Sequence, residues 1–306
     1  MTPEALLDVA LSYLNRGWRP IPVPFRKKAP IGDGWQTLVI TVENAPQHFN
    51  GRAQNIGVLL GRASGGLADV DLDCPEAIAL AHSYLPATPA IFGRASKQKS
   101  HRLYLSDLCD KEDKAALQFR EPKQDGGAGP MLIELRIGGG GKGAQTVFPG
   151  SVHEDGEPIL WDSDGDPPRV PGDDLVGAVK VIAAASLLAR RYPGAGSRHE
   201  GALTLGGALA RRGWDADAIQ SYVRRIAYVA GDAEWRERGT TAAGAVDLFA
   251  KGDKVRGLPK ARARLGKSRR RKGGRVAGPW RRRTRACAAT RSAATLLRRG
   301  AGSRIR

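Results

Sequence analysis

Long apolar runs and cysteines are both scarce in this sequence of 306 residues. No run of about 18 apolar residues occurs, so we expect no membrane-spanning helix and no membrane partner. The first residues include the acidic Glu4 and Asp8 and lack a basic start, so we expect no secretory signal peptide. The three cysteines, Cys74, Cys109 and Cys287, lack the spacing of metal ligands. This favours a reducing, cytoplasmic setting without a disulfide framework.

Acidic residues are absent from the C-terminal segment, and the net charge of +18 is concentrated there. Residues 267–306 hold 15 Lys and Arg and no Asp or Glu, which leaves a net charge of only +3 for residues 1–266. Net charge is therefore no argument for what the body of the chain does. Because the basic segment lacks apolar periodicity, we expect a disordered tail over residues 267–306. Two interpretations stay open: a basic arm that binds phosphates, or a C-terminus altered by a reading-frame change or truncation.

The rest of the sequence divides into a region of alternating strands and helices and a region of helices alone. The first predicts an α/β or α+β domain over residues 1–165. Residues 166–174, rich in Asp, Pro and Gly, predict a linker, and residues 175–266 predict a small helical region. Strands are expected near residues 18–25, 55–60, 67–73, 90–92, 102–105, 131–137 and 146–148. Polar residues 96–100 are interpreted as a separator between strands, and residues 107–118 as a helix or a loop.

The motif Asp71–Leu72–Asp73 organises the first region. Its apolar–acidic alternation predicts a β-strand that carries both carboxylates on one face. Because Cβ atoms two residues apart on a strand lie roughly 6–7 Å apart, the carboxylates repel unless a cation lies between them. Oxygen ligands of this kind favour Mg²⁺ or Mn²⁺. Two alternatives stay open, a solvated strand face or turn, and a phosphatase with Asp71 as nucleophile and Asp73 as acid.

Further candidates lie downstream of this motif. His101 follows Ser100 at the start of a predicted strand, and Glu134 shares a strand face with Arg136 two residues on. By themselves these residues are typical of a surface histidine and of an ordinary ion pair on a strand. Lys28 by itself is typical of a solvated turn.

Taken together and in order, these segments resemble one family over residues 6–161. They are Lys28–Ala29–Pro30, Asn55–Ile56–Gly57, Ser64–Gly65–Gly66–Leu67, Asp71–Leu72–Asp73, Ser100–His101, Glu134 and Phe148–Pro149–Gly150–Ser151–Val152–His153. The family is the N-terminal domain of bifunctional DNA primase/polymerases (prim-pol), within the archaeo-eukaryotic primase superfamily. The resemblance implies an α+β fold with an RRM-like core, a mixed or antiparallel sheet and flanking helices.

The resemblance also implies roles for the candidate residues. Asp71, Asp73 and Glu134 correspond to the ligands of the catalytic Mg²⁺ or Mn²⁺ ions. Ser100 and His101 correspond to the motif whose histidine contacts the phosphates of the incoming nucleotide. Arg136 and Lys28 are candidate phosphate contacts by their charge. The family usually has glycines just before its histidine, where this chain has Lys97–Gln98–Lys99–Ser100, so we expect lysine charge to replace close backbone contact there.

The implied function is template-directed, metal-dependent nucleotidyl transfer that makes and extends primers on single-stranded DNA. The expected partners are single-stranded DNA, nucleoside triphosphates and a separate replicative helicase, in the replication of a phage, plasmid or bacterial genome. The competing hypothesis is a catalytically silent DNA-binding module of the same fold. The absence of the family's usual downstream helicase region and the unusual tail motivate it, whereas the intact acidic residues and His101 favour an enzyme.

Overall fold

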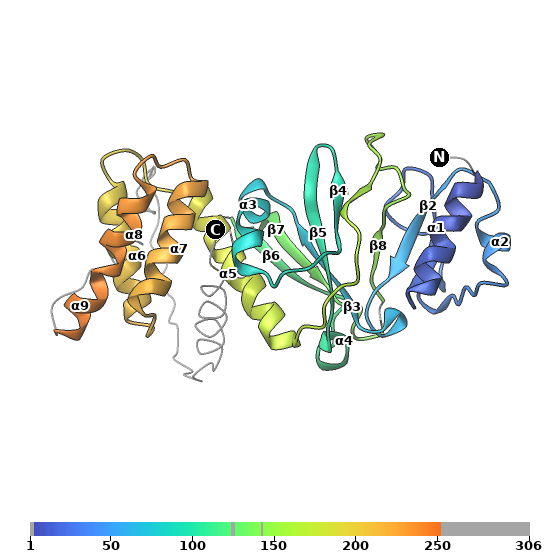
Figure 1. Cartoon of the computed structure of the whole chain (residues 1–306), viewed down its shortest axis with the longest axis horizontal. Coiled ribbons are helices and arrows are strands. Elements are labelled where there is room, and N and C mark those ends of the chain that lie inside the picture. The colour runs from blue at the N-terminus through green and yellow to red at the C-terminus, as the bar shows by residue number, and fades with distance from the viewer. Residues whose placement is uncertain (1–2, 124–125, 142, 252–306) are drawn as a thin grey trace. The chain divides into compact units, whose positions relative to one another are not determined.

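The computed structural model describes residues 3–123, 126–141 and 143–251 (Figure 1). The chain separates into two compact units at Ala183 and Ala184, and each is described by itself. This division falls inside helix α5 (Gly172–Arg190). The expected linker over residues 166–174 therefore stays a prediction, and the expected tail lies outside the described residues. Among the described helices, no stretch is long and apolar enough to cross a membrane.

The first unit is built on two antiparallel sheets, which confirms the α+β prediction. The larger sheet has the strand order β6-β7-β3-β5-β4-β9. Its strands are β3 (Leu67–Leu72), β4 (Ile91–Arg94), β5 (Lys97–Leu105), β6 (Ala116–Pro122), β7 (Ala128–Arg136) and β9 (Leu160–Ser163). The smaller sheet has the order β1-β2-β8, with β1 (Arg19–Pro24), β2 (Gln54–Leu59) and β8 (Gln145–Val147).

Short helices connect and cover these strands. They are α1 (Pro3–Asn15), α2 (Ala45–His48), α3 (Pro75–Tyr84) and α4 (Leu108–Lys111), with 3₁₀ turns η1 (Trp35–Thr37) and η2 (Arg62–Ser64). In Figure 1, α1 lies beside β1 and β2. An aromatic cluster centred on Phe148 joins α1 to the edge of the larger sheet, since Tyr13, Trp18, Phe92 and Trp161 all contact its ring. This packing fixes the segment after β8 against β4 and β9 at the edge of the larger sheet.

Two expectations about strands were wrong. Residues 97–100 belong to β5, which forms a tight hairpin with β4 across the two-residue turn at Ala95 and Ser96. Their side chains are all polar, and those of Gln98 and Lys99 are exposed, so no apolar periodicity marks this end of the strand. Residues 116–118, the end of the segment expected to be a helix or a loop, instead begin β6. This strand is at the edge of the sheet and buries little of its surface, which explains its weak pattern.

Gly66 fixes the entry of the chain into β3. Its φ of +90° lies in the left-handed region, and an added Cβ would lie 2.6 Å from the backbone oxygen of Ser106. A side chain would therefore meet both backbone strain and a steric clash. The next residues run as the central strand of the sheet, with every position of β3 buried. The alternation of the motif then puts Val70 and Leu72 on one face and the aspartates on the other.

The second unit contains the helices α6 (Arg198–Ala210), α7 (Ala216–Val229), α8 (Trp235–Ala243) and α9 (Ala245–Ala250). The Asp215 carboxylate caps the N-terminus of α7, because it accepts a hydrogen bond from the Ala218 N–H at 2.8 Å. Gly244 separates α8 from α9. The buried Asp232 accepts hydrogen bonds from Tyr192, Arg198 and Arg238 at 3.0–3.3 Å and so connects three parts of the unit.

Candidate active site

The strand register brings the main candidates together around Asp71. In the larger sheet, β3 lies between β5 and β7, and Asp71 pairs with His101 on one side and Glu134 on the other. Side chains directly opposite each other on neighbouring antiparallel strands lie on the same face about 5 Å apart. Asp73 directly follows β3, two residues beyond Asp71. Three candidates from three strands therefore lie side by side across the sheet, with Asp73 next to them, and the carboxylates among them are called the acidic row.

Asp69, two residues before Asp71 in β3, holds His101 in place. Its side chain has no exposed surface, and it accepts hydrogen bonds from Thr146 Oγ1 at 2.8 Å and from His101 Nδ1 at 3.0 Å. The imidazole of His101 is also stacked on Phe92, with ring centroids 4.5 Å apart. These contacts fix the histidine and direct its Nε2 toward Asp71 Oδ1, 3.8 Å away. Asp69 was not among the predicted site residues, although its place in the Asp-x-Asp-x-Asp alternation was the available signal.

Arg136 bridges the carboxylates of β3 and β7. Its guanidinium donates to Asp71 Oδ2 and Glu134 Oε2, each at 2.8 Å, and approaches Asp69 Oδ2 at 3.4 Å. A fourth hydrogen bond, of 3.1 Å, goes to Thr146 Oγ1. Glu134 also accepts a hydrogen bond from Gln118 at 2.7 Å. The structure thus places Arg136 as a counter-ion of the acidic row, and the ion pair expected between it and Glu134 is present.

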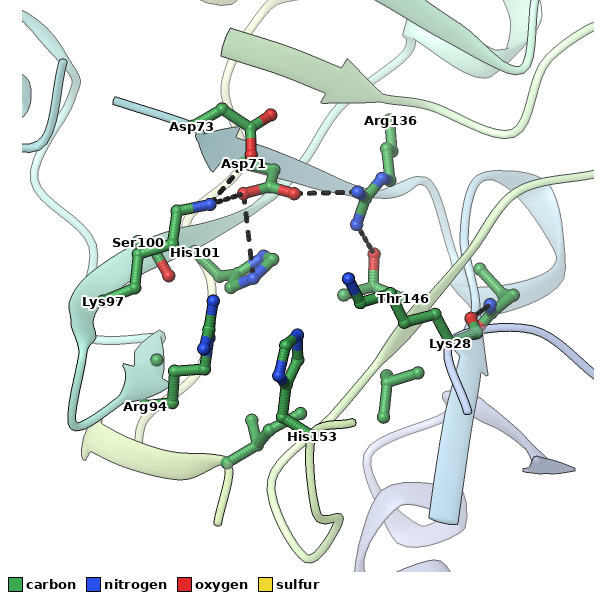
Figure 2. Close-up of a pocket in the computed structure, with 14 residues that line it drawn as sticks. Lys28, Asp71, Asp73, Arg94, Lys97, Ser100, His101, Arg136, Thr146 and His153 are labelled. Atoms are coloured by element: carbon green, nitrogen blue, oxygen red, sulfur yellow. Dashed lines mark hydrogen bonds and ion pairs between the residues drawn. The ribbon is translucent and has the colours of Figure 1, made fainter. Parts of the chain in front are cut away.

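Lys97 bridges the two aspartates of the motif. Its ammonium lies 3.1 Å from Asp71 Oδ1 and 2.9 Å from Asp73 Oδ1 (Figure 2). Burial by itself disfavours the charged form of Asp71, but the charges of His101, Arg136 and Lys97 outweigh it and lower its pKa to about 2. Burial and the neighbouring charge of Asp71 raise the pKa of Asp73 above its ordinary value. For His101, burial is outweighed by the aspartates, and its pKa is raised.

These groups open into a cavity of about 380 Å³ within the first unit. It is lined by Lys28, Asp71, Asp73, Gly93, Arg94, Lys97, Ser100, His101, Arg136, Gln145, Thr146, Val147, His153 and Ile159. All predicted site residues except Glu134 thus line one cavity. Glu134 adjoins it through Arg136, which lies in contact with both Glu134 and Asp71.

A basic wall faces the acidic row across this cavity. Figure 2 shows Arg94 and His153 directed into the cavity from the side opposite Asp71 and Asp73. Arg94 is paired with Asp155 at 3.0 Å and Glu157 at 3.1 Å, which fixes its position. Burial and the nearby positive charges lower the pKa of His153.

The sequence indicated some residues of this wall and not others. His153 lies in the segment that carried part of the family resemblance, but nothing in the sequence around Arg94 marked it. Lys28, which was predicted, lines the cavity and pairs with Glu154 at 2.6 Å on its outer edge.

The acidic motif has the chemistry of a cation site. Among the described residues, no three His, Cys, Asp or Glu side chains are grouped so as to hold a metal ion. Asp71 and Asp73 nevertheless share one cation already, the Lys97 ammonium, at distances of 3.1 Å and 2.9 Å. A metal ion bound by both carboxylates would take the place of this ammonium, and hard carboxylate oxygens suit Mg²⁺ or Mn²⁺. Asp71 and Asp73 would hold such an ion, and Glu134 pairs with Asp71 on the neighbouring strand β7.

These observations define a mixed α+β domain with a cavity that carries aspartates on one side and an arginine and a histidine on the other. Residues 10–173 match the Prim-Pol family, the N-terminal domain of bifunctional DNA primase/polymerases. Because the match covers more than half of the chain, the protein belongs to this family, as its sequence motifs predicted. No curated protein matches the chain.

Proposed function

We propose that this protein is a DNA primase/polymerase that joins nucleoside triphosphates on a single-stranded DNA template, using Mg²⁺ or Mn²⁺. The observation that carries the proposal is the single cavity in which Asp71 and Asp73 face Arg94 and His153. An acidic side suits a cation, and a basic side suits the phosphates of a triphosphate. A partner helicase, a phage or plasmid setting and a cytoplasmic location belong to the same proposal as expectations.

Asp71 and Asp73 are the proposed metal ligands, with Glu134 as the third. Bound Mg²⁺ or Mn²⁺ would activate the 3′-hydroxyl of the primer and neutralise charge on the leaving pyrophosphate. His101 is held by Asp69 and Phe92, and its raised pKa favours the protonated form, which donates hydrogen bonds. We assign its Nε2 to a phosphate oxygen of the incoming nucleotide.

The basic wall supplies the remaining proposed contacts to the triphosphate. Arg94 is preorganised by its two carboxylate partners, so little conformational freedom is lost when it binds phosphate. Ser100 and His153 add hydrogen-bond donors to the same cavity, and Lys28 lies at its rim. We propose Arg136 as a positioning residue that holds Asp71 and Glu134, in addition to its predicted contact with phosphate.

A primer-synthesis assay tests this proposal with single-stranded DNA, labelled nucleotides and Mn²⁺ or Mg²⁺. We expect Asp71→Asn and Asp73→Asn each to lower incorporation by at least about 10²-fold, the size of effect seen when electrostatic stabilisation of a transition state is removed. Asp8→Asn on α1 is the matched control, because Asp8 is exposed and lies outside the cavity. Incorporation that survives both substitutions would refute the assignment. Hydrolysis of a generic phosphate ester that depends on Asp71 would instead favour a phosphatase.

One observation favours the silent DNA-binding module as a second candidate. Asp71 and Asp73 are already neutralised in part by Lys97, as in a site that no longer needs a metal ion. That candidate predicts binding of single-stranded DNA without incorporation under any metal condition. The same lysine leads to a different interpretation below.

A further inference from the structure

Lys97 is held where its ammonium substitutes for a metal ion. Its side chain is 22% exposed, and it contacts Asp71, which is 8% exposed, and Asp73, which is 27% exposed. The two aspartate oxygens that it contacts belong to the pair assigned above to the divalent cation. One positive group therefore occupies the position between the two carboxylates, and a metal ion that binds both must displace it.

The backbone around Lys97 is fixed, whereas its side chain is long and flexible. Ser96, at the hairpin turn, donates from its N–H and its hydroxyl to the carboxylate of Glu157. Gly93 packs so closely against Lys97 that an added Cβ would lie 2.4 Å from the Lys97 oxygen. The β4–β5 register shifts between Phe92 and Arg94, so β5 bulges just after Lys97. The hairpin thus holds the Lys97 backbone in place, and only its four-carbon stem is left to move.

The charged groups around Asp71 differ in how easily they can leave it. Arg136 is bound to four partners and His101 is stacked on Phe92, so both are fixed parts of the site. Lys97 instead contacts Asp71 and Asp73 through one ammonium on a flexible stem. An ammonium of this kind can exchange one set of anionic partners for another at small structural cost.

We propose that Lys97 is a displaceable internal counter-cation. Without metal it neutralises Asp71 and Asp73 and stabilises the unit, and when a divalent cation binds it turns into the cavity toward the phosphates of the nucleotide. The movement of Lys97 toward the phosphates rests on the proposed function. The competition between Lys97 and a metal ion for Asp71 and Asp73 does not depend on that function. A metal ion can bind only those molecules in which the ammonium has left the two aspartates. The apparent affinity of the site for metal is therefore the intrinsic affinity multiplied by the fraction of such molecules.

The test compares Lys97→Met with Lys99→Met in the full chain. Lys99 lies two residues further along β5, is exposed, and loses the same charge on substitution without touching the aspartates. Free Mn²⁺ is measured by its paramagnetic resonance signal during titration, without DNA or nucleotide. We expect Lys97→Met to bind Mn²⁺ about tenfold more tightly than the wild type, and Lys99→Met to stay within about twofold. Asp71→Asn should lose this binding, which assigns the ion to this site.

Thermal melting shows whether the Lys97→Met variant is folded. In EDTA, Lys97→Met should melt at a lower temperature than the wild type, and saturating Mn²⁺ should raise its melting temperature by more. Lys97→Arg keeps the charge and should bind Mn²⁺ no more tightly than the wild type.

The outcomes separate this inference from the proposed function. If a folded Lys97→Met variant binds Mn²⁺ no more tightly than the wild type, the counter-cation proposal is overturned, even if the protein makes primers. Tighter Mn²⁺ binding without any nucleotide incorporation would support the counter-cation and refute the polymerase proposal. Failure of every variant to bind Mn²⁺ would overturn both.

Discussion

Replacing Arg136 with methionine removes the main fixed counter-charge of the acidic row. Arg136 contacts Asp71 and Glu134 at 2.8 Å and Asp69 at 3.4 Å, and Asp69 has no exposed surface. Methionine keeps much of the volume of the arginine stem but none of its charge. The carboxylates would then remain buried with fewer positive partners, a situation that is far more costly than the loss of an exposed ion pair.

The expected loss follows from which partners remain. Removing one member of a buried ion pair costs about 3–5 kcal/mol. Thr146 and His101 still contact Asp69, and Lys97 still contacts Asp71, so we expect the lower end, about 3 kcal/mol. For a unit of this size, this corresponds to a fall of roughly 6–12 °C in melting temperature.

Thermal denaturation of the protein in EDTA measures this effect. Arg120→Met is the matched control, because Arg120 is exposed on β6 of the same sheet and its contacts are with Gln118 and a backbone carbonyl. It should cost less than about 0.5 kcal/mol. Asp71→Asn in the Arg136→Met background removes a charge left without its partner, so the double variant should be more stable than additivity predicts. A melting temperature equal to that of Arg120→Met, or a strictly additive cycle, would refute the reasoning.

The contribution of Asp71 to the stability of the first unit depends on pH in a definite direction. Asp71 has an ordinary pKa of 3.8 and a pKa of about 2 in the folded unit. A group whose pKa is lowered by folding stabilises the fold above its ordinary pKa, and that stability is lost as the pH falls through the folded value. Arg136 supplies part of the charge that lowers this pKa, so in Arg136→Met this contribution should be smaller, and its loss should be complete at a higher pH than in the wild type. Acid titration of the melting temperature measures the difference.

Two further predictions concern the basic wall and the second unit. Arg94→Met and His153→Gln should each raise the KM for nucleotide about tenfold, as expected for a lost charged or polar contact to phosphate. They should change kcat little, whereas the exposed Lys114→Met should change neither constant. Asp232→Asn should destabilise the second unit by about 3 kcal/mol, because its side chain is 1% exposed and is paired with two arginines. Asp247→Asn, at an exposed position of α9, should leave its unfolding unchanged.

Local pattern was sufficient for the elements whose apolar and polar residues alternate or whose ends carry strong signals. β3 follows from its alternating apolar and acidic residues, and the start of α7 follows from the capping carboxylate of Asp215. β6 could not be found in this way, since an edge strand buries too little surface to impose a pattern. The hairpin extension at Lys97 was missed for the same reason, because polar residues at an exposed strand end look like a loop.

The site was predictable only where residues share a strand. Asp71 and Asp73 were placed together because they are two residues apart, and Glu134 and His101 only through their order in a family motif. Pairings between strands depend on the register of the whole sheet, which local sequence does not encode. The role of Asp69 required knowing that Thr146 and His101 converge on it from two other strands.

The charges of the site suggest how many metal ions it can hold before a nucleotide arrives. Four carboxylates, Asp69, Asp71, Asp73 and Glu134, meet the fixed cations Arg136 and protonated His101. Once Lys97 has left, the formal charge of this group is −2, which one divalent ion balances. A second ion would have to bring its own compensating charge, and the triphosphate is the natural source. We therefore expect one Mn²⁺ per chain at this site without nucleotide and additional Mn²⁺ only with it, whereas two tightly bound ions in the nucleotide-free protein would show that this charge balance is wrong.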